Sequence, residues 1–395
     1  MNPELALLQP YPFEKLRTLL TGINPADKPH IALSVGEPKH DAPQFVLDAL
    51  VEKLRGVETY PSTRGSEEFR FSVANWLCQR FALDKAEHLA NHQILPVNGT
   101  REALFAIAQC VLDRSKKATD VLMPNPFYQI YEGAVLLAGC RPAFYNISAN
   151  GDDDINAITD KQYKLCQLFY LCNPGNPTGS VLSQNVIAQL IEKAHQFNFL
   201  IVSDECYSEI YRNSASPPTG LLQTAHEMGN THYKHCLVFH SLSKRSNLPG
   251  LRSGFIAGDQ DVVDQFLLYR TYHGCSMSLP VQYASAIAWQ DENHVQANRV
   301  AYDQKYDAVL ALLQPVLALS KPDAGFYLWP KIPDNDTTFT QKMLQEENLA
   351  LVPGSYLGRE VNGINPGTNH VRLALVAQLD ECIDAANRLI SALQS

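Results

Sequence analysis

The chain has 395 residues, of which 45% are hydrophobic, so it can bury a large core as one big domain or as a large domain with a smaller one. A net charge of −9 without any basic tract argues against nucleic acid as a partner. The nine cysteines stand singly, with no C-x-x-C pair, so we predict reduced thiols and no metal site.

The N-terminal residues contain no basic segment that leads into an apolar one, and no run approaches the ~18 apolar residues of a membrane span. We therefore expect a cytoplasmic protein with no membrane partner. Residues 1–40 show no sheet partner in the central region, and we expect them to form an arm that packs with the C-terminal part.

From about Gln93 to Gly258 the chain alternates short apolar runs with segments of helical period, which predicts βαβ units and a largely parallel sheet. Most of these runs are apolar on both sides, so we expect helices on both faces of the sheet. The predicted strands are 93–99, 119–124, 140–146, 166–172, 199–205, 236–242 and 254–258.

Two of the connecting helices have clear signals. Residues 184–197 carry apolar side chains at helical spacing after a possible cap at Ser183. Residues 100–113 begin a helix directly after the glycine turn "VNG", and such a helix N-terminus is a natural seat for an anion.

From about Pro280 a long helical pattern leads into short apolar runs at 324–332, 347–355 and 369–376, which predicts a smaller α/β layer. We therefore divide the chain into an N-terminal arm (1–40), a large cofactor-binding domain (41–285) and a small C-terminal domain (286–395). The one loose loop that we expect is "NSASPPTG" at 213–220.

Polar motifs follow the predicted strands at the edge where open α/β sheets bind ligands. They are "NPGNPTG" at 173–179, "SDECY" at 203–207, "SLSK" at 241–244, and Arg252. Each one alone is better explained as turn punctuation, a helix cap or a surface cation. Their combination in this order is a strong signal.

With these motifs, the chain resembles the class I aminotransferases of the pyridoxal-phosphate fold type I group along nearly its whole length. Residues 11–40 and 60–70 resemble, more narrowly, proteobacterial N-succinyldiaminopimelate aminotransferases. The resemblance implies an aspartate aminotransferase-like α/β fold, with a mostly parallel sheet flanked by helices and a smaller α/β domain. It also implies pyridoxal 5'-phosphate as the cofactor.

The resemblance assigns Lys244 to the Schiff base with the cofactor aldehyde and to proton transfer at the substrate Cα. Such a lysine must be neutral when it acts, and we expect burial and the neighbouring cation Arg252 to favour the neutral amine. Asp204 is expected to pair with the pyridine nitrogen, and Tyr207 and Asn176 with the phenolic oxygen. Lys244, Asp204 and Tyr207 are thus the implied catalytic residues.

The cofactor phosphate is expected to bind residues that match the family's phosphate cradle. They are Gly99, Thr100 and Arg101 at the helix start, Ser241, and Arg252, with Ser243 as a weaker candidate. Tyr128 matches the aromatic side chain that stacks on the ring, although Phe127 beside it leaves the choice open. Core packing is the plain alternative for either aromatic residue.

Arg372 matches the arginine that binds the substrate α-carboxylate, with an internal salt bridge as the alternative. Gly36 matches a glycine whose backbone lies against the substrate, with a turn as the alternative. Tyr60 matches a tyrosine that reaches the phosphate of the neighbouring subunit, which implies a homodimer with shared active sites.

The expected reaction is transamination between N-succinyl-LL-2,6-diaminopimelate and 2-oxoglutarate, giving N-succinyl-2-amino-6-oxopimelate and glutamate, a step of lysine biosynthesis. Aminotransferases for N-acetylornithine, aromatic amino acids or aspartate, and β-lyases of the same fold, stay open as alternatives. A sensor domain of a transcription regulator fits poorly, because few residues precede "SVGEP". Arg17, Arg64 and Arg270 are candidates for the succinyl tail, and Arg245 has no assigned role.

Overall fold

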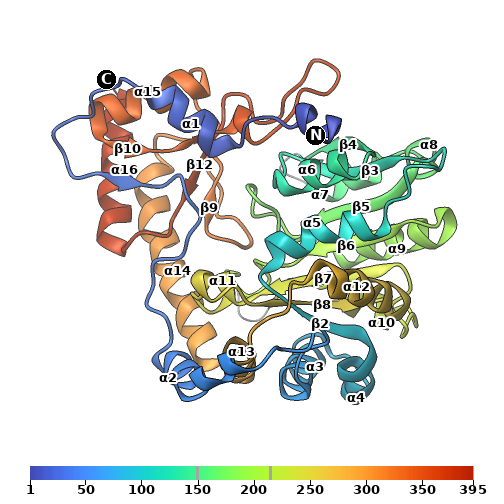
Figure 1. Ribbon diagram of the computed structural model, residues 1–395. Helices are drawn as coiled ribbons and strands as arrows, with labels where there is room; N and C mark the ends of the chain where they lie inside the picture. The colour runs from blue at the N-terminus through green and yellow to red at the C-terminus, as the bar shows by residue number, and fades with distance from the viewer. Residues whose placement is uncertain (148–150, 213–215, 395) are drawn as a thin grey trace.

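The computed structural model describes residues 1–147, 151–212 and 216–394. Part of the expected loop at 213–220, residues 213–215, lies outside this range. The chain folds into a large α/β part around one seven-stranded sheet and a smaller part that contains the C-terminus, while the N-terminus lies beside α6 of the large part (Figure 1). None of the described helices is long and apolar enough to cross a membrane.

The large sheet confirms the predicted strands and their mostly parallel arrangement. In spatial order its strands are β2 (Ile94–Val97), β8 (Gly254–Gly258), β7 (Cys236–Ser241), β6 (Leu200–Asp204), β5 (Cys166–Cys172), β3 (Asp120–Asn125) and β4 (Arg141–Asn146). Among these strands β8 alone runs opposite to the others, so it pairs antiparallel with both β2 and β7. It follows β7 through a short connection, whereas a parallel return would need a longer crossover.

Helices cover both faces of the sheet, as expected from strands that are apolar on both sides. Alternate residues point to opposite cores, so Ile201 packs in one cluster and Val202 in the other. One face carries α5 (Thr100–Val111), α6 (Ile130–Leu137) and α12 (Gln260–His273). The other carries α3 (Glu67–Phe81), α9 (Gln184–Phe197), α10 (Leu221–Glu227) and α13 (Leu279–Gln290).

The two predicted helices form close to their expected bounds. The Ser183 side chain caps α9 by accepting a hydrogen bond from the Val186 amide at 3.4 Å. The remaining short elements of the large part are α2 (Gln44–Glu52), η2 (Leu54–Glu58), α4 (Ala86–His88), η3 (Leu89–Gln93), α7 (Gly151–Asn156), α8 (Asp160–Tyr163), α11 (Leu242–Arg245) and η4 (Pro249–Leu251).

The smaller part combines an N-terminal segment with the C-terminal third of the chain. Its elements are α1 (Pro12–Leu20), β1 (Ile31–Ala32), α14 (Asn293–Leu313), β9 (Tyr327–Leu328), α15 (Asp336–Glu347), β10 (Leu349–Ala350), β11 (Val352–Pro353), η5 (Gly354–Tyr356), β12 (Val371–Ala374) and α16 (Leu379–Gln394). The first short helix, η1 (Pro3–Leu7), packs instead against α6 of the large part. Strands β11, β12 and β9 form an antiparallel sheet, and β1 pairs in parallel with β10. The division at residues 40 and 285 stays a prediction.

Helix α14 connects the two parts. It packs against α16 in the smaller part and runs down to the region of α2 and α13 (Figure 1). The N-terminal segment makes a second connection, because it runs from β1 in the smaller part to α2 in the large part. The residues between Leu33 and Pro43 therefore pass from one part to the other. This crossing places residues 34–40 beside the sheet edge that carries the polar motifs.

Candidate active site

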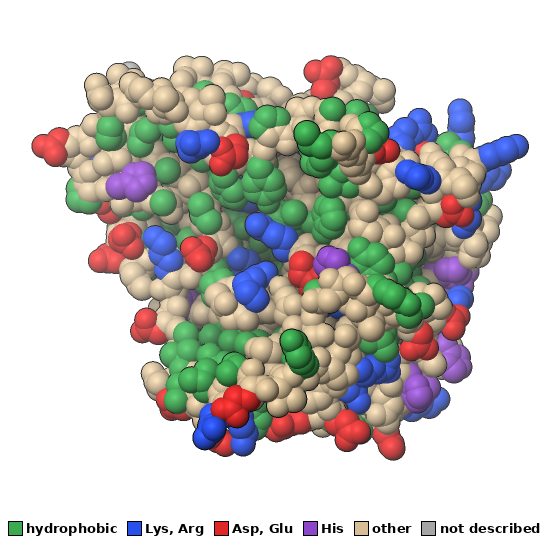
Figure 2. Space-filling view, viewed as in Figure 1, with side chains coloured by type: hydrophobic (Ala, Val, Ile, Leu, Met, Phe, Trp, Pro, Cys, Tyr) green, Lys and Arg blue, Asp and Glu red, His purple; other side chains and the backbone are tan. Residues whose placement is uncertain are grey.

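A cleft of about 460 Å³ lies between the two parts, at the C-terminal ends of β6 and β7. Figure 2 shows this hollow, with Lys and Arg side chains inside it and hydrophobic side chains around it. The predicted site residues that line it are Gly36, Thr100, Arg101, Tyr128, Asn176, Asp204, Tyr207, Ser241, Lys244, Arg252 and Arg372. Seven segments that are distant in sequence thus converge on one cavity.

Lys244 extends from α11 into the cleft, and its amine donates a hydrogen bond to the Gly36 carbonyl. Burial is the main reason that the pKa of this amine falls to about 8, and the positive charges of Arg372 and Arg101 contribute in the same direction. We expected Arg252 in that role, but the cations that act on Lys244 are these two. The lysine is therefore held close to the neutral form that proton transfer requires.

Asp204 ends β6 and is only 5% exposed. Burial raises the pKa of its carboxyl, while hydrogen bonds from the Cys206 amide at 3.3 Å and the Tyr131 hydroxyl at 2.8 Å oppose this by favouring the charged form. Sequence reasoning missed Tyr131. The available signal was its position three residues after Tyr128 in "PNPFYQIY", which places both on one side of a helix start.

Arg372 lies on β12 at the opposite wall of the cleft. Its Nη1 donates to Asn176 Oδ1 at 3.3 Å and its Nη2 to the Ser34 carbonyl at 2.9 Å, and the guanidinium lies 4.5 Å from the Tyr327 ring. Its buried Nε has no hydrogen-bond partner, and Arg372 forms no ion pair within the described residues. A buried cation with an open donor is suited to an incoming carboxylate.

Tyr207 and Tyr327 form a second pair at this wall, with their hydroxyl oxygens 3.0 Å apart. Tyr327 lies on β9 of the smaller sheet and was not predicted as a site residue. A Cβ at Gly36 would overlap the Tyr327 hydroxyl, so only glycine lets the crossing segment lie this close to the ring.

The start of α5 forms the other end of the cleft. Gly99 precedes the helix with φ +80°, and a Cβ there would overlap the Arg252 guanidinium. Gly99 therefore lies behind Arg252 and outside the lining itself. Arg252 donates to the Pro249 carbonyl at 2.8 Å, and this exposed arginine beside a helix N-terminus makes a seat for an anion.

Ser241 and Thr100 lie at the same end. Ser241 caps α11, because its hydroxyl accepts from the Ser243 amide at 3.0 Å. The same hydroxyl donates to the Ser253 carbonyl at 3.2 Å, and Thr100 Oγ1 lies 3.1 Å from Cys206 Sγ.

The geometry distinguishes between the two neighbouring aromatic candidates. Phe127 is 3% exposed and packs on Phe144, with ring centroids 5.1 Å apart, as a core residue does. The Tyr128 hydroxyl accepts a hydrogen bond from Arg101 Nε at 2.5 Å, which fixes the Tyr128 ring at the cleft wall. Tyr128 is thus the aromatic side chain held by a polar contact from the site.

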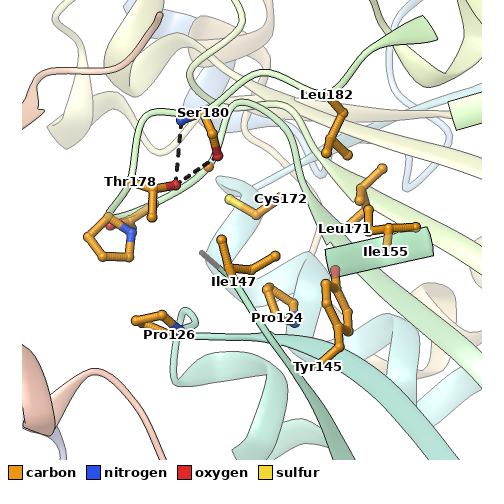
Figure 3. Close-up of a pocket in the computed structure, with 13 residues that line it drawn as sticks. Pro124, Pro126, Tyr145, Ile147, Ile155, Leu171, Cys172, Thr178, Ser180 and Leu182 are labelled. Carbon is orange, nitrogen blue, oxygen red and sulfur yellow. Dashed lines mark hydrogen bonds between the residues drawn. The ribbon is translucent and has the colours of Figure 1, made fainter. Parts of the chain in front are cut away.

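A small second pocket lies behind Asn176, on the other side of the loop 173–179 (Figure 3). Its lining is mostly apolar, with Pro124, Tyr145 and Leu171 among the residues drawn. Both Asn–Pro bonds of the loop are cis, and Thr178 and Ser180 bond to each other at 2.9 Å. Asn176 lines both pockets, so the loop presents this side chain between them.

Several candidates lie outside the cleft. Tyr60 is fully exposed, so within its own chain it contacts no part of the site. The three arginines that are candidates for the succinyl tail do not line the cleft of their own chain, and each has a partner elsewhere: Arg17 pairs with Glu14, Arg64 with the Asn91 carbonyl, and Arg270 with Glu102. Their role in tail binding stays a prediction.

Arg245, which had no role, points away from Lys244 into the protein. It is 2% exposed, bonds the Ala288 carbonyl at 2.8 Å and Glu292, and lies 4.7 Å from the Trp289 ring. The two adjacent cations therefore serve different purposes, and Arg245 attaches α11 to α13.

Comparisons with known proteins agree with this geometry. The family model for aminotransferase class I and II matches residues 28–388. An aminotransferase from Neisseria meningitidis has a solved structure that is 44% identical, with a TM-score of 0.93 and 99% of each chain covered.

The curated relatives include an LL-diaminopimelate aminotransferase from Maridesulfovibrio salexigens, 27% identical over 98% of this chain and 97% of its own. A probable aminotransferase from Mycobacterium tuberculosis is 32% identical and matches over 91% of this chain and 80% of its own. A probable N-succinyldiaminopimelate aminotransferase from Thermus thermophilus shares the fold, with a TM-score of 0.83 at 23% identity over 96% of this chain and all of its own.

The cleft holds a lysine of lowered pKa, a buried carboxylate, an anion seat and an arginine with an open donor, and the family model spans the elements that carry all four. The chain therefore belongs to the class I and II aminotransferase family and is a pyridoxal phosphate-dependent transaminase.

Proposed function

We propose that the enzyme transfers the amino group of N-succinyl-LL-2,6-diaminopimelate to 2-oxoglutarate. The observation that supports an amino-acid substrate is the pairing of a near-neutral Lys244 with the open donor of Arg372 across one cleft. The diaminopimelate skeleton is supported by the likeness of residues 11–40 and 60–70 and by curated relatives named for LL-diaminopimelate.

The residues of the cleft fit the cofactor. Asp204 would hold the ring nitrogen, and Tyr207 and Asn176 the phenolic oxygen. The phosphate would lie at the start of α5, between Ser241 and Arg252, where the missing Cβ of Gly99 leaves room for the guanidinium. When bound, the cofactor supplies an electron sink that makes the hydrogen on the substrate Cα acidic.

The protein's own groups bind and orient the substrate. Arg372 would bind the α-carboxylate through its two-pronged guanidinium, and Asn176 would keep that guanidinium turned into the cleft. Lys244 Nζ would then take the proton from the substrate Cα, because burial keeps the amine able to accept it. The amino donor and the oxo-acid acceptor each carry an α-carboxylate, so the same arginine can bind both in turn.

Steady-state kinetics tests the substrate. We expect kcat/KM for N-succinyl-LL-2,6-diaminopimelate to exceed those for LL-diaminopimelate, N-acetylornithine, aspartate and aromatic amino acids. A higher value for free LL-diaminopimelate would replace the proposed substrate and match the names of the curated relatives. Formation of pyruvate and ammonia in place of glutamate would instead indicate a β-lyase.

We also propose that the enzyme is a homodimer in which Tyr60 reaches the partner's site. Large apolar side chains gather without cover near Tyr60: Val51 is 70% exposed, Leu54 55% and Val57 66%. Figure 2 shows hydrophobic side chains gathered where Figure 1 places α2 and α13. Such a patch on α2 and η2 is typical of a subunit interface.

The dimer is tested by Val57→Asp, since a charge buried in an interface is costly. We expect this variant to be monomeric by light scattering, whereas Met228→Asp, on the end of α10 at another side of the molecule, keeps the wild-type mass. A dimeric Val57→Asp protein would contradict this assignment of the interface.

A further inference from the structure

Behind Lys244, outside the cleft lining, a chain of polar side chains joins three segments. Lys305 and Asn298 lie on α14, and His40 ends the segment that crosses between the two parts. Lys305 Nζ lies 2.6 Å from His40 Nε2, and His40 Nδ1 lies 2.8 Å from Asn298 Oδ1. Asn298 Nδ2 donates to the carbonyl of Lys244 at 3.2 Å.

The directions of these hydrogen bonds are determined by Asn298. Its Nδ2 donates to two carbonyls, those of Lys244 and Arg245, so its Oδ1 is the acceptor. That oxygen receives Asn247 Nδ2 at 3.0 Å and His40 Nδ1. His40 therefore carries a hydrogen on Nδ1.

The other ring nitrogen of His40 faces Lys305. A lysine ammonium can only donate, so its bond to Nε2 requires the neutral imidazole. Lys305 is 2% exposed, forms no ion pair within the described residues, and also donates to the Val376 carbonyl at 3.3 Å. Val376 follows β12, the strand of Arg372, so the chain of bonds reaches both walls of the cleft.

The crossing segment is thus attached at three points. The Ser34 carbonyl accepts from Arg372, the Gly36 carbonyl accepts from Lys244, and His40 bonds to Lys305 and Asn298. Lys244 is held at its amine through Gly36 and at its backbone through Asn298.

We propose that His40 is a positioning residue for transamination, which aligns Lys244 by connecting Lys305 to Asn298 through the two nitrogens of one neutral imidazole. It touches neither cofactor nor substrate and acts through the Lys244 backbone and the 34–40 segment.

The charges around His40 make this alignment pH-dependent. Burial lowers the pKa of His40, the hydrogen bond with Asn298 raises it, the charge of Lys305 lowers it, and Asp41 raises it. The Tyr302 ring packs on the imidazole at 4.7 Å, and Cys382 and Glu381 face Lys305 from α16. At low pH the His40–Lys305 pair takes up a second proton, so both side chains become cations. Repulsion between them then replaces their hydrogen bond.

The test uses the pH midpoint of the visible absorption of the cofactor-loaded enzyme, which requires no substrate and reports the surroundings of Lys244. His40→Phe keeps the packing on Tyr302 but removes both hydrogen bonds. His40→Gln keeps one donor and one acceptor and cannot titrate. His30→Phe is the matched control, because His30 lies on the same N-terminal segment and bonds Asn348 at 2.8 Å, far from Lys244.

We expect His40→Phe to shift the spectral midpoint and to lower kcat by about ten- to a hundredfold, with KM changed much less. His40→Gln should restore the spectral midpoint of the wild type, and its kcat should lack the decline at acid pH. His30→Phe should match the wild type in both measurements. Equal midpoints in His40→Phe and His30→Phe would overturn the proposal. If His40→Phe does not fold, an unchanged acid decline in His40→Gln overturns it.

Discussion

Burial shifts the pKa values of the two ionisable groups at the centre of the cleft in opposite directions. It lowers the pKa of Lys244 to about 8 and raises the pKa of Asp204. Lys244 benefits, because the reaction needs its neutral form. In its proposed role Asp204 would need its charge to pair with a protonated ring nitrogen, and the hydrogen bonds from Tyr131 and the Cys206 amide favour that charge.

The Asp204→Asn variant tests this role of the carboxylate. An amide of the same shape carries no charge, so we expect kcat to fall by at least about a hundredfold while the fold is kept. Tyr131→Phe removes a single neutral donor and should lower kcat by only about tenfold or less. Stopped-flow half-reaction rates measure both effects, and equal rates for Asp204→Asn and the wild type would reject the assignment.

At the scale of elements, α11 turns two adjacent cations to opposite sides. Ser241 caps this short helix, which directs Lys244 into the cleft and Arg245 against α13. The position of the lysine thus depends on how firmly the arginine attaches the helix to the core.

Arg245→Met tests that attachment. The variant loses the bonds to the Ala288 carbonyl and Glu292 and the contact with the Trp289 ring, so we expect a loss of about 2 kcal/mol in the free energy of unfolding. Arg17→Met is the control, since Arg17 forms only an exposed pair with Glu14 and should change stability by less than about 0.5 kcal/mol. Chemical denaturation measures both, and equal losses would contradict the role of Arg245.

Hydrophobic patterning predicted the seven strands and the helices at 100–113 and 184–197, and the strand-end motifs together with the family resemblance predicted about half of the residues that line the cleft. These features depend on local sequence, such as the two-sided apolar runs and the Ser183 cap. The direction of β8 and the contacts of Tyr327 and Arg270 could not be predicted, because they depend on which distant segments meet. Arg245 shows why such contacts escape a prediction from sequence. It follows Lys244 directly in the chain, yet the two side chains face different surroundings.

At the scale of the whole molecule, the burial of Lys244 ties stability to pH. In the unfolded chain this amine has its ordinary pKa of 10.5, and in the folded chain a pKa of about 8. Between these values the unfolded state binds more protons, so this group makes folding more favourable as pH rises from 8 to 10.5. Below pH 8 the folded protein bears the full penalty of a buried ammonium.

Lys244→Met in the cofactor-free protein tests this dependence. The variant should gain stability over the wild type below pH 8, by roughly 3 kcal/mol at most, from a pKa difference of 10.5 − 8 = 2.5. The gain should shrink as pH approaches 10.5. Denaturation series at several pH values measure the difference, and a difference that does not vary over this range would mean that the amine is not buried.

The bond between Lys244 and the Gly36 carbonyl has a consequence for how the enzyme takes up its cofactor. In its proposed role Lys244 would join the cofactor aldehyde and release this carbonyl, so loading would remove one hydrogen bond of the crossing segment. Deuterium uptake by the amides of residues 34–40 should then differ between the empty and loaded protein. Deuterium uptake in this segment, measured by mass spectrometry, would therefore report whether the cofactor is bound without any need for turnover.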